Sequence, residues 1–129
     1  MSDNITEVIN RTPGWVREMG ITILAASPDE VTCEWEVSEK HLQAYGIVHG
    51  GVHCGIIETL ASLGAALVAL PRGQRVVGLE NNNTSFIRAV RSGVRHGRVA
   101  EQLLHRDGVR AARRAQRGLT NYQRLTPLV

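Results

Sequence analysis

GGVHCGIIETLASLGAALVAL, residues Gly50 to Leu70, is a long apolar stretch that carries a single carboxylate, Glu58. Its apolar positions cover nearly the whole circumference of a helix, which predicts a buried helix and not an amphipathic surface helix. A carboxylate among such neighbours is costly unless it is paired, protonated or used in chemistry. Buried glutamates on helices are often structural acids, so Glu58 alone leaves a structural and a functional role open.

The bulk properties predict one folded domain over residues 1–129. The chain has 43% hydrophobic and 21% charged residues, which argues against wholesale disorder. The polar N-terminus does not resemble a signal peptide, and polar residues such as His53 and Glu58 interrupt the longest apolar run, so no membrane span is expected. Cys33 and Cys54 are expected to be reduced thiols, which favours the cytoplasm.

Segments on either side of the apolar stretch predict strands. An apolar run at residues 21–26, a turn at 27–29 and apolar/polar alternation over 31–37 indicate a hairpin. Upstream, a helix is expected over 12–19, with Thr12 as N-cap and Pro13 in its first position. Downstream, QRVVGLENNNTSFIRAV (74–90) predicts one strand with a bulge or break among its asparagines. A sheet wrapped on one buried helix, an α+β fold, follows from this order.

His49, Gly50 and Gly51 stand where the buried helix should begin. A helix start exposes unpaired backbone N–H groups and the positive end of the helix dipole, and glycine lets a ligand approach that backbone closely. An acyl carbonyl oxygen bound there would be stabilised as it gains negative charge. The position alone therefore makes an oxyanion site available.

Other chemistries find less support in the same residues. His49 and His53 have helical i, i+4 spacing with Cys54 and Glu58 near, which is a metal-site pattern, but the zincin glutamate after the first histidine is missing. The segment around Ser62 lacks the first glycine of a nucleophile elbow, and the sequence contains neither a P-loop nor a Rossmann fingerprint. We expect no metal and no resident cofactor.

Charge is unevenly distributed along the chain. Residues 1–87 hold five Lys/Arg and ten Asp/Glu, whereas residues 88–129 hold ten Arg and two acids, within a net charge of +3. A basic half of this kind is compatible with nucleic-acid binding. No stacking aromatics interleave these arginines, however, so a solvated basic face is the favoured interpretation and nucleic acid is not expected as a partner.

Two segments carry a family resemblance: HLQAYGIVHGGVHCGIIETLAS (41–62) and VVGLENNNTSFIRAVRSG (76–93). Together they resemble the hotdog-fold acyl-CoA thioesterases of the PaaI-like and Arthrobacter-type 4-hydroxybenzoyl-CoA thioesterase group. The resemblance covers about residues 12–93. It implies a hotdog fold, in which an antiparallel β-sheet wraps a long central helix, and hydrolysis of an acyl-CoA thioester, with an aromatic acyl group expected. The motif residues in register are Gln43, His49, Gly50, Gly51, Glu58 and Ser62.

The resemblance also implies roles for individual residues. Glu58 would act as nucleophile or general base on the thioester carbonyl, and the amide of Gly50 would polarise the carbonyl oxygen. His49 and Gln43 would position the thioester and order the loop. Ser62 is a further expected catalytic residue, and with Thr59 it would help to hold water or substrate from the other subunit. The expected substrate-binding residues are Gly51, Thr59, Phe86 and Arg88, the last near the coenzyme A phosphates.

The same resemblance implies active sites shared between two subunits. We therefore expect a homodimer or a dimer of dimers, that is, a homotetramer. Acyl-CoA is the expected partner, and its coenzyme A is part of the substrate and not a cofactor. Two alternative functions stay open: a non-catalytic acyl-CoA-binding hotdog module, and nucleic-acid binding through the basic tail.

Residues 94–129 depart from the family pattern. In the family, three further strands fill the middle of the sheet, but this segment lacks the alternation and the β-branched content that central strands favour. Read locally, Val109 to Arg117 predicts a short basic helix. We expect the fold to be retained at least through residue 93, and the C-terminal strands stay an open question.

Overall fold

A computed structural model describes residues 4–73, 80–85, 88–100, 103–105, 108–110 and 122–126. Its elements are α1 (Ile5–Arg11), α2 (Trp15–Glu18), β1 (Thr22–Ala26), β2 (Glu30–Glu36), η1 (Glu39–His41), α3 (Gly50–Ala69), η2 (Leu70–Arg72), β3 (Glu80–Ser85), β4 (Val94–Ala100), β5 (Leu103–His105), β6 (Gly108–Arg110) and β7 (Tyr122–Thr126).

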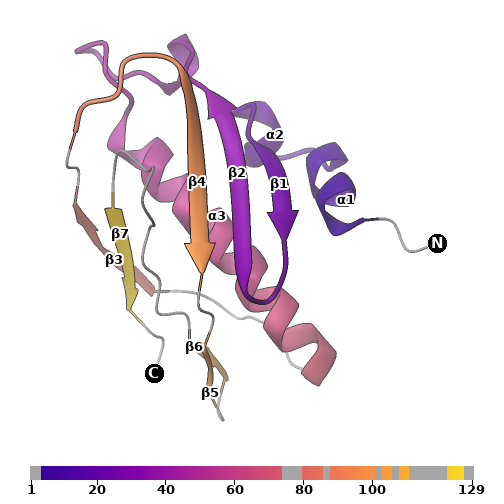
Figure 1. The fold of residues 1–129 in the computed structure, drawn as a ribbon. Coiled ribbons are helices and arrows are strands. Elements are labelled where there is room, and N and C mark those ends of the chain that lie inside the picture. The colour runs from indigo at the N-terminus through magenta and orange to yellow at the C-terminus, as the bar shows by residue number, and fades with distance from the viewer. Residues whose placement is uncertain are drawn as a thin grey trace.

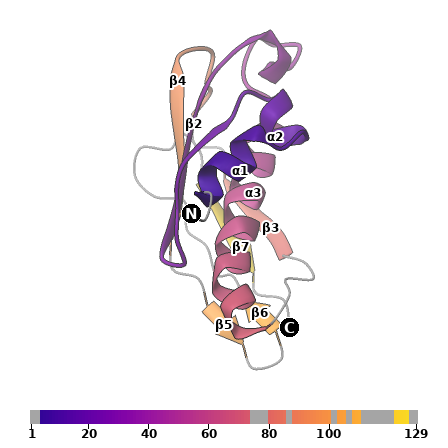
Figure 2. The ribbon, with the colours of Figure 1, turned by 90° about the vertical axis from the view of Figure 1, so that its right-hand side faces the viewer.

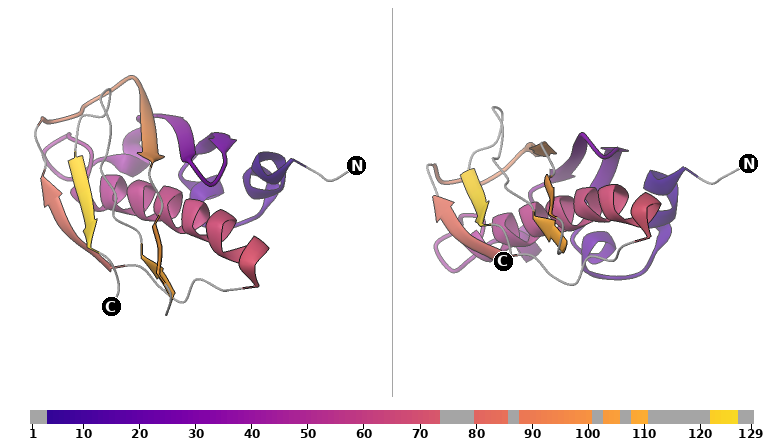
Figure 3. Two further views of the ribbon diagram at one scale, coloured as in Figure 1. Left: turned by 60° about the horizontal axis from the view of Figure 1, so that its bottom comes forward. Right: turned by 90° about the horizontal axis from the view of Figure 1, so that it is seen from below.

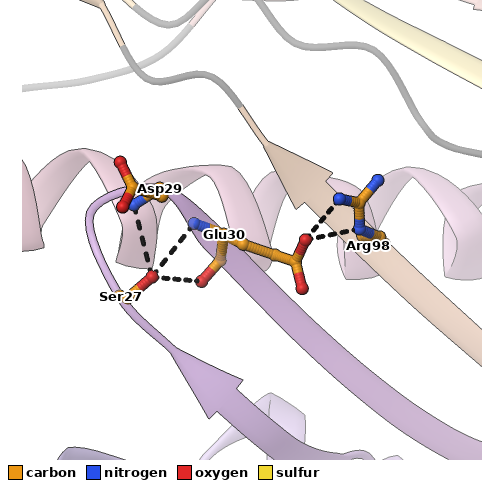
Figure 4. A network of polar contacts seen from close by, with 4 residues as sticks. All are labelled: Ser27, Asp29, Glu30 and Arg98. Carbon is orange, nitrogen blue, oxygen red and sulfur yellow. Dashed lines mark hydrogen bonds and ion pairs between the residues drawn. The ribbon is translucent and has the colours of Figure 1, made fainter.

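The strands β1, β2 and β4 form an antiparallel sheet in that order, and this sheet lies across α3 (Figure 1). The β1–β2 hairpin has the predicted turn, in which the Ser27 N–H donates to the Glu30 carbonyl (2.9 Å). The Ser27 hydroxyl oxygen accepts from the N–H groups of Asp29 and Glu30 (Figure 4). The Glu30 carboxylate then accepts from Arg98 Nε of β4 at 2.6 Å, so the turn is tied to the next strand.

The core lies between this sheet and α3. Val31, Cys33 and Trp35 are buried on the inner face of β2, which confirms the predicted alternation. Gly97 allows β4 to pack closely, since a Cβ there would lie 2.8 Å from Cys33 Sγ and 3.0 Å from Leu60 Cδ1. The buried hydrophobic residues that α3 contributes to this core are Val52, Ile56, Ile57, Leu60 and Ala61.

The long helix α3 confirms the prediction for residues 50–70 almost to the residue. Figure 2 shows α2 and α3 on the same side of the three-stranded sheet. The segment Gly50–Arg72 is long and apolar enough to cross a membrane by length and composition, so the expectation that its polar residues prevent this was wrong. Its packing against β2 and β4 accounts for that apolarity, because a core helix of a folded domain needs the same composition.

The helix predicted over 12–19 is confirmed only as the short α2, Trp15–Glu18, and its predicted start at Thr12 and Pro13 was wrong. The chain forms α1 earlier, with Asn4 as its N-cap, whose side-chain oxygen accepts the Thr6 N–H at 3.1 Å. Thr12 stands at the C-terminal end of α1, where its hydroxyl donates to the Val8 carbonyl at 2.7 Å. Its hydroxyl therefore satisfies an end of the preceding helix, and the short α2 begins only after Gly14.

The sheet continues past residue 93, which the sequence left open. Strand β4 pairs with β2 along its whole length, from Glu30 opposite Ala100 to Glu36 opposite Val94. On its outer face the exposed His96 lies opposite Glu34, with 3.4 Å between Nε2 and Oε2. Cross-strand partners on β2 thus stabilise a strand whose own β-branched content is low.

The tail also forms strands. β5 and β6 pair as a hairpin, and β7 pairs with β3 beside the helix (Figure 3). The basic helix predicted over 109–117 is wrong at Val109 and Arg110, which belong to β6 and pair with β5, and the rest of that range lies outside the described residues. The register of β3 shifts between Glu80 and Asn83, which confirms the predicted irregularity among the asparagines.

Candidate active site

A compact loop delivers the chain to the start of α3. Leu42 and Val48 form an isolated antiparallel bridge, and the Gln43 N–H donates to the Ile47 carbonyl at 2.8 Å. Gly46 closes a turn by donating its N–H to the Gln43 carbonyl at 2.9 Å, with a φ of +75° that favours glycine. The half-buried Gln43 therefore sits in an ordered loop next to the helix start.

His49 is the N-cap of α3. Its Nδ1 accepts the Gly51 N–H at 2.8 Å, and its carbonyl accepts the Val52 N–H at 2.9 Å. The Gly50 N–H, in contrast, donates to none of the described residues. The cap thus uses the neighbouring amides and leaves the Gly50 amide for a ligand at the positive end of the helix.

Glu58 lies two turns further on and is exposed, which corrects the prediction of a buried carboxylate. At about 100° of rotation per residue, its side chain points away from Ile56 and Leu60, which pack toward the sheet. The Ser62 hydroxyl donates to Glu58 Oε1 at 2.6 Å, as expected for residues one turn apart. The exposed Gly51, seven residues earlier, lies on the same open face.

Of three further predicted site residues, Thr59 and Arg88 lie within the described part of the chain. The Thr59 hydroxyl donates to the backbone carbonyl one turn earlier at 2.8 Å, so the helix itself satisfies it. Arg88 is exposed and lies two residues before Val90, whose carbonyl accepts the Val48 N–H at 2.7 Å. The Arg88 segment therefore runs beside the loop that leads into α3. Phe86 lies outside the described residues.

His41 supports this site and was missed from the sequence. It is 1% exposed, and its Nδ1 accepts the Ser38 N–H at 2.9 Å, so Nε2 carries the proton and donates to the Met19 carbonyl at 2.8 Å. Its own carbonyl accepts the His49 N–H at 2.8 Å. Through its ring and its backbone carbonyl, His41 thus connects the end of α2 to the N-cap of α3. The Ser-x-x-His spacing at Ser38 was the available signal.

His53 is a half-buried residue of α3 that packs against Trp35. Its ring and that of Trp35 are 5.9 Å apart in a T-shaped arrangement, and His41 makes a similar contact with Trp35 at 4.9 Å. Burial, and next the positive charge of Arg95, lower the pKa of His53 to about 4. His53 is therefore neutral at pH 7. Within the part of the chain that the structure describes, no cluster of three His, Cys, Asp or Glu residues could hold a metal.

Acidification should weaken the fold through His53. The pKa of His53 is about 4 in the folded protein and close to 6.5 in the unfolded chain. Between these two values the unfolded state binds the proton and the folded state does not, so the free energy of unfolding decreases as the pH is lowered. After allowance for partial exposure, we expect a loss of about 1–2 kcal/mol from pH 7 to pH 5 through this residue. Urea unfolding of the parent and of His53→Gln measures it, and equal pH slopes for the two proteins would contradict it.

Comparison with known proteins assigns the chain to a family. The model of the Thioesterase superfamily matches residues 45–101. The protein named "Putative esterase Rv1847" from Mycobacterium tuberculosis is 40% identical over 97 residues, which span 74% of this chain and 68% of that protein. The chain belongs to the thioesterase superfamily. Human acyl-coenzyme A thioesterase 13 is 32% identical to this chain over 88 residues, which span 65% of this chain and 61% of the human protein.

Solved structures of similar proteins share this fold. The structure of the Mycobacterium tuberculosis protein superposes with a TM-score of 0.67 at 33% identity and covers 88% of this chain and 94% of that one. A mutant of thioesterase PA1618 from Pseudomonas aeruginosa has a TM-score of 0.78 at 22% identity, covering 99% and 97%, and so shows the shared fold.

The comparisons decide several predictions. Membership of the thioesterase superfamily, the hotdog-type α+β fold with its long helix and antiparallel sheet, and the thioesterase class of enzyme are confirmed. The family match runs to residue 101. It therefore includes β4, in agreement with the pairing of that strand with β2.

Proposed function

We propose that this thioesterase hydrolyses acyl-CoA thioesters, with aromatic acyl groups as its main substrates, to the free acid and coenzyme A. One observation carries the proposal. The Gly50 amide, which bonds to none of the described residues, and the Glu58–Ser62 pair belong to the first four turns of α3. The relatives that bear thioesterase names support the reaction class.

The geometry suits the electronic demands of a thioester. The carbonyl oxygen would accept the Gly50 N–H, and the amide and the positive helix end would stabilise it as it becomes an oxyanion. Glu58 would either attack the carbonyl carbon itself or take a proton from the attacking water. When the tetrahedral centre collapses, the C–S bond breaks and the thiolate departs, which needs no strong general acid. With water as the attacking group this step gives the free acid, whereas direct attack leaves the acyl group on Glu58 as a mixed anhydride, which a water molecule then hydrolyses to the free acid and the Glu58 carboxylate.

Neighbouring residues would hold the substrate and the catalytic groups. His49 keeps the first turn of α3 in place through the Gly51 amide, and the Ser62 hydroxyl holds one oxygen of Glu58. Gln43 would contact the thioester from the ordered loop. Arg88, exposed near that loop, would pair with phosphates of the coenzyme A, which is substrate and not cofactor.

A second copy of the chain would complete this site. We propose a homodimer or a dimer of dimers in the cytoplasm. Glu58 is open to solvent in a single chain, and a partner packed on that face of α3 would exclude water from the carboxylate. Burial raises the pKa of the Cys33 thiol to about 11, so this thiol stays protonated and unreactive in a reducing compartment.

A thiol-release assay tests the proposal. The parent protein is given phenylacetyl-, 4-hydroxybenzoyl-, octanoyl- and acetyl-CoA, and we expect turnover with kcat/KM of roughly 10⁴ M⁻¹s⁻¹ or more for the aromatic thioesters. Absence of thiol release from all four would overturn it. Tight binding of a non-hydrolysable thioether analogue without any turnover would instead favour the non-catalytic acyl-CoA-binding module.

A further inference from the structure

Trp15 is a large aromatic side chain that does not belong to the buried core. It remains 41% exposed. Val16 of the same short helix and Met19, its C-cap, pack against the core and so anchor α2. The hydrogen bond from His41 to the Met19 carbonyl, 2.8 Å, fixes the end of that helix further. The indole is therefore held from a secured backbone while a large part of its surface stays open.

The indole lies directly on Gly55 of α3. A Cβ at Gly55 would be 2.7 Å from Trp15 Cη2 and 2.9 Å from Cζ2, so only a residue without a side chain lets the ring occupy this place. On a helix, residues three or four apart are neighbours, which puts Gly55 between Gly51 and Glu58. The ring thus borders the open face of α3 that carries the carboxylate.

That face is otherwise poor in apolar surface. Its exposed or half-buried residues, Gly51, Gly55, Glu58 and Ser62, are small or polar. The carbonyl of a thioester held at Gly50 would leave its acyl group to lie along α3, away from the coenzyme A moiety at Arg88. An acyl group in this position requires an apolar wall, which a half-exposed indole beside Gly55 supplies.

We propose that Trp15 is a specificity-determining residue, whose indole forms one wall of the acyl-group site and favours large apolar and aromatic acyl groups. The inference rests on the proposed acyl-CoA hydrolysis and adds the residue that selects the acyl group. Gly55 is the positioning residue for this wall, because it creates the space in which the ring lies. Contact with an acyl group would remove exposed apolar surface of both partners from water.

The test compares selectivity and not only activity. In Trp15→Ala we expect kcat/KM to fall about tenfold for phenylacetyl- and octanoyl-CoA and to change little for acetyl-CoA, since acetyl is too short to reach the ring. Trp15→Phe should recover most of the preference. Gly55→Ala, which pushes the ring away, should lose the preference as Trp15→Ala does. Leu24→Ala removes a comparably exposed side chain, 48%, from β1 and should leave the preference unchanged.

Binding gives a second readout that does not depend on turnover. Calorimetry with the thioethers S-octyl-CoA and S-methyl-CoA should show weaker octyl binding in Trp15→Ala and no change for methyl. Equal losses for short and long acyl groups, or no change for either, would overturn the role of Trp15 while leaving acyl-CoA hydrolysis intact. A parent protein that turns over no acyl-CoA would count against the proposed function, and the thioether affinities would still decide the role of Trp15.

Discussion

Glu58→Gln should abolish nearly all thioester hydrolysis, with kcat lower by about 10³-fold and KM little changed. Glutamine keeps the shape of the side chain and an oxygen that can accept from the Ser62 hydroxyl, which now bonds to Oε1 at 2.6 Å. It cannot take a proton or attack a carbonyl carbon at neutral pH. Steady-state thiol release over a range of phenylacetyl-CoA concentrations gives both constants.

The control is a glutamate of the same kind outside the site. Glu7→Gln changes an exposed helical carboxylate on α1 whose only recorded partner among the described residues is Arg11, at 2.9 Å, and it should match the parent. Circular dichroism and thermal melts of both variants should overlay with the parent, because Glu58 is exposed and supports no core contact. A Glu58→Gln enzyme that keeps more than a tenth of the parent kcat would exclude Glu58 as nucleophile or general base.

The helix and the hairpin were predictable because their signals are local. Apolar residues from Gly50 onward give the length of α3, and the glycines and His49 mark its start. Alternation along β2 fixes which of its side chains face inward, and the Pro28 turn fixes where the hairpin reverses. Each of these features depends on residues within a few positions of one another.

The exposure of Glu58 could not be predicted in this way. When apolar residues cover the whole circumference of a helix, the pattern does not say which side the sheet will take. Packing decides it, with Ile56 and Leu60 toward β2 and β4 and Glu58 outward. The inward-facing positions of β4 were also hidden in the sequence. One of them is Gly97, where the close approach of α3 leaves no room for a side chain, so the apolar/polar alternation of a strand does not show.

Contacts between distant segments were also beyond the sequence. His41 donates to the Met19 carbonyl, 22 positions away, and the Trp15 ring fits over Gly55 on another helix. Neither pair has a spacing that any periodicity would reveal. The motif residues could be matched to a family, whereas the groups that support and border them emerge only when the chain is folded.

Gly50→Pro should remove the oxyanion donor without disturbing the helix. Gly50 is the first residue of α3, a position that proline favours because its missing N–H is not needed there. His49 before it has φ −62° and ψ 132°, the extended conformation that a following proline requires. The Gly50 N–H donates to none of the described residues, so folding loses no recorded hydrogen bond.

We expect kcat for phenylacetyl-CoA to fall about 10²–10³-fold in Gly50→Pro, the usual cost of deleting one oxyanion donor. Gly50→Ala is the matched control, since it adds a side chain at the same place but keeps the N–H, and it should retain most of the activity. Melting temperatures of both variants should stay close to that of the parent. If Gly50→Pro and Gly50→Ala are equally active, the carbonyl oxygen is not bound by this amide, and the stabilisation of the oxyanion must come from another donor near the start of α3.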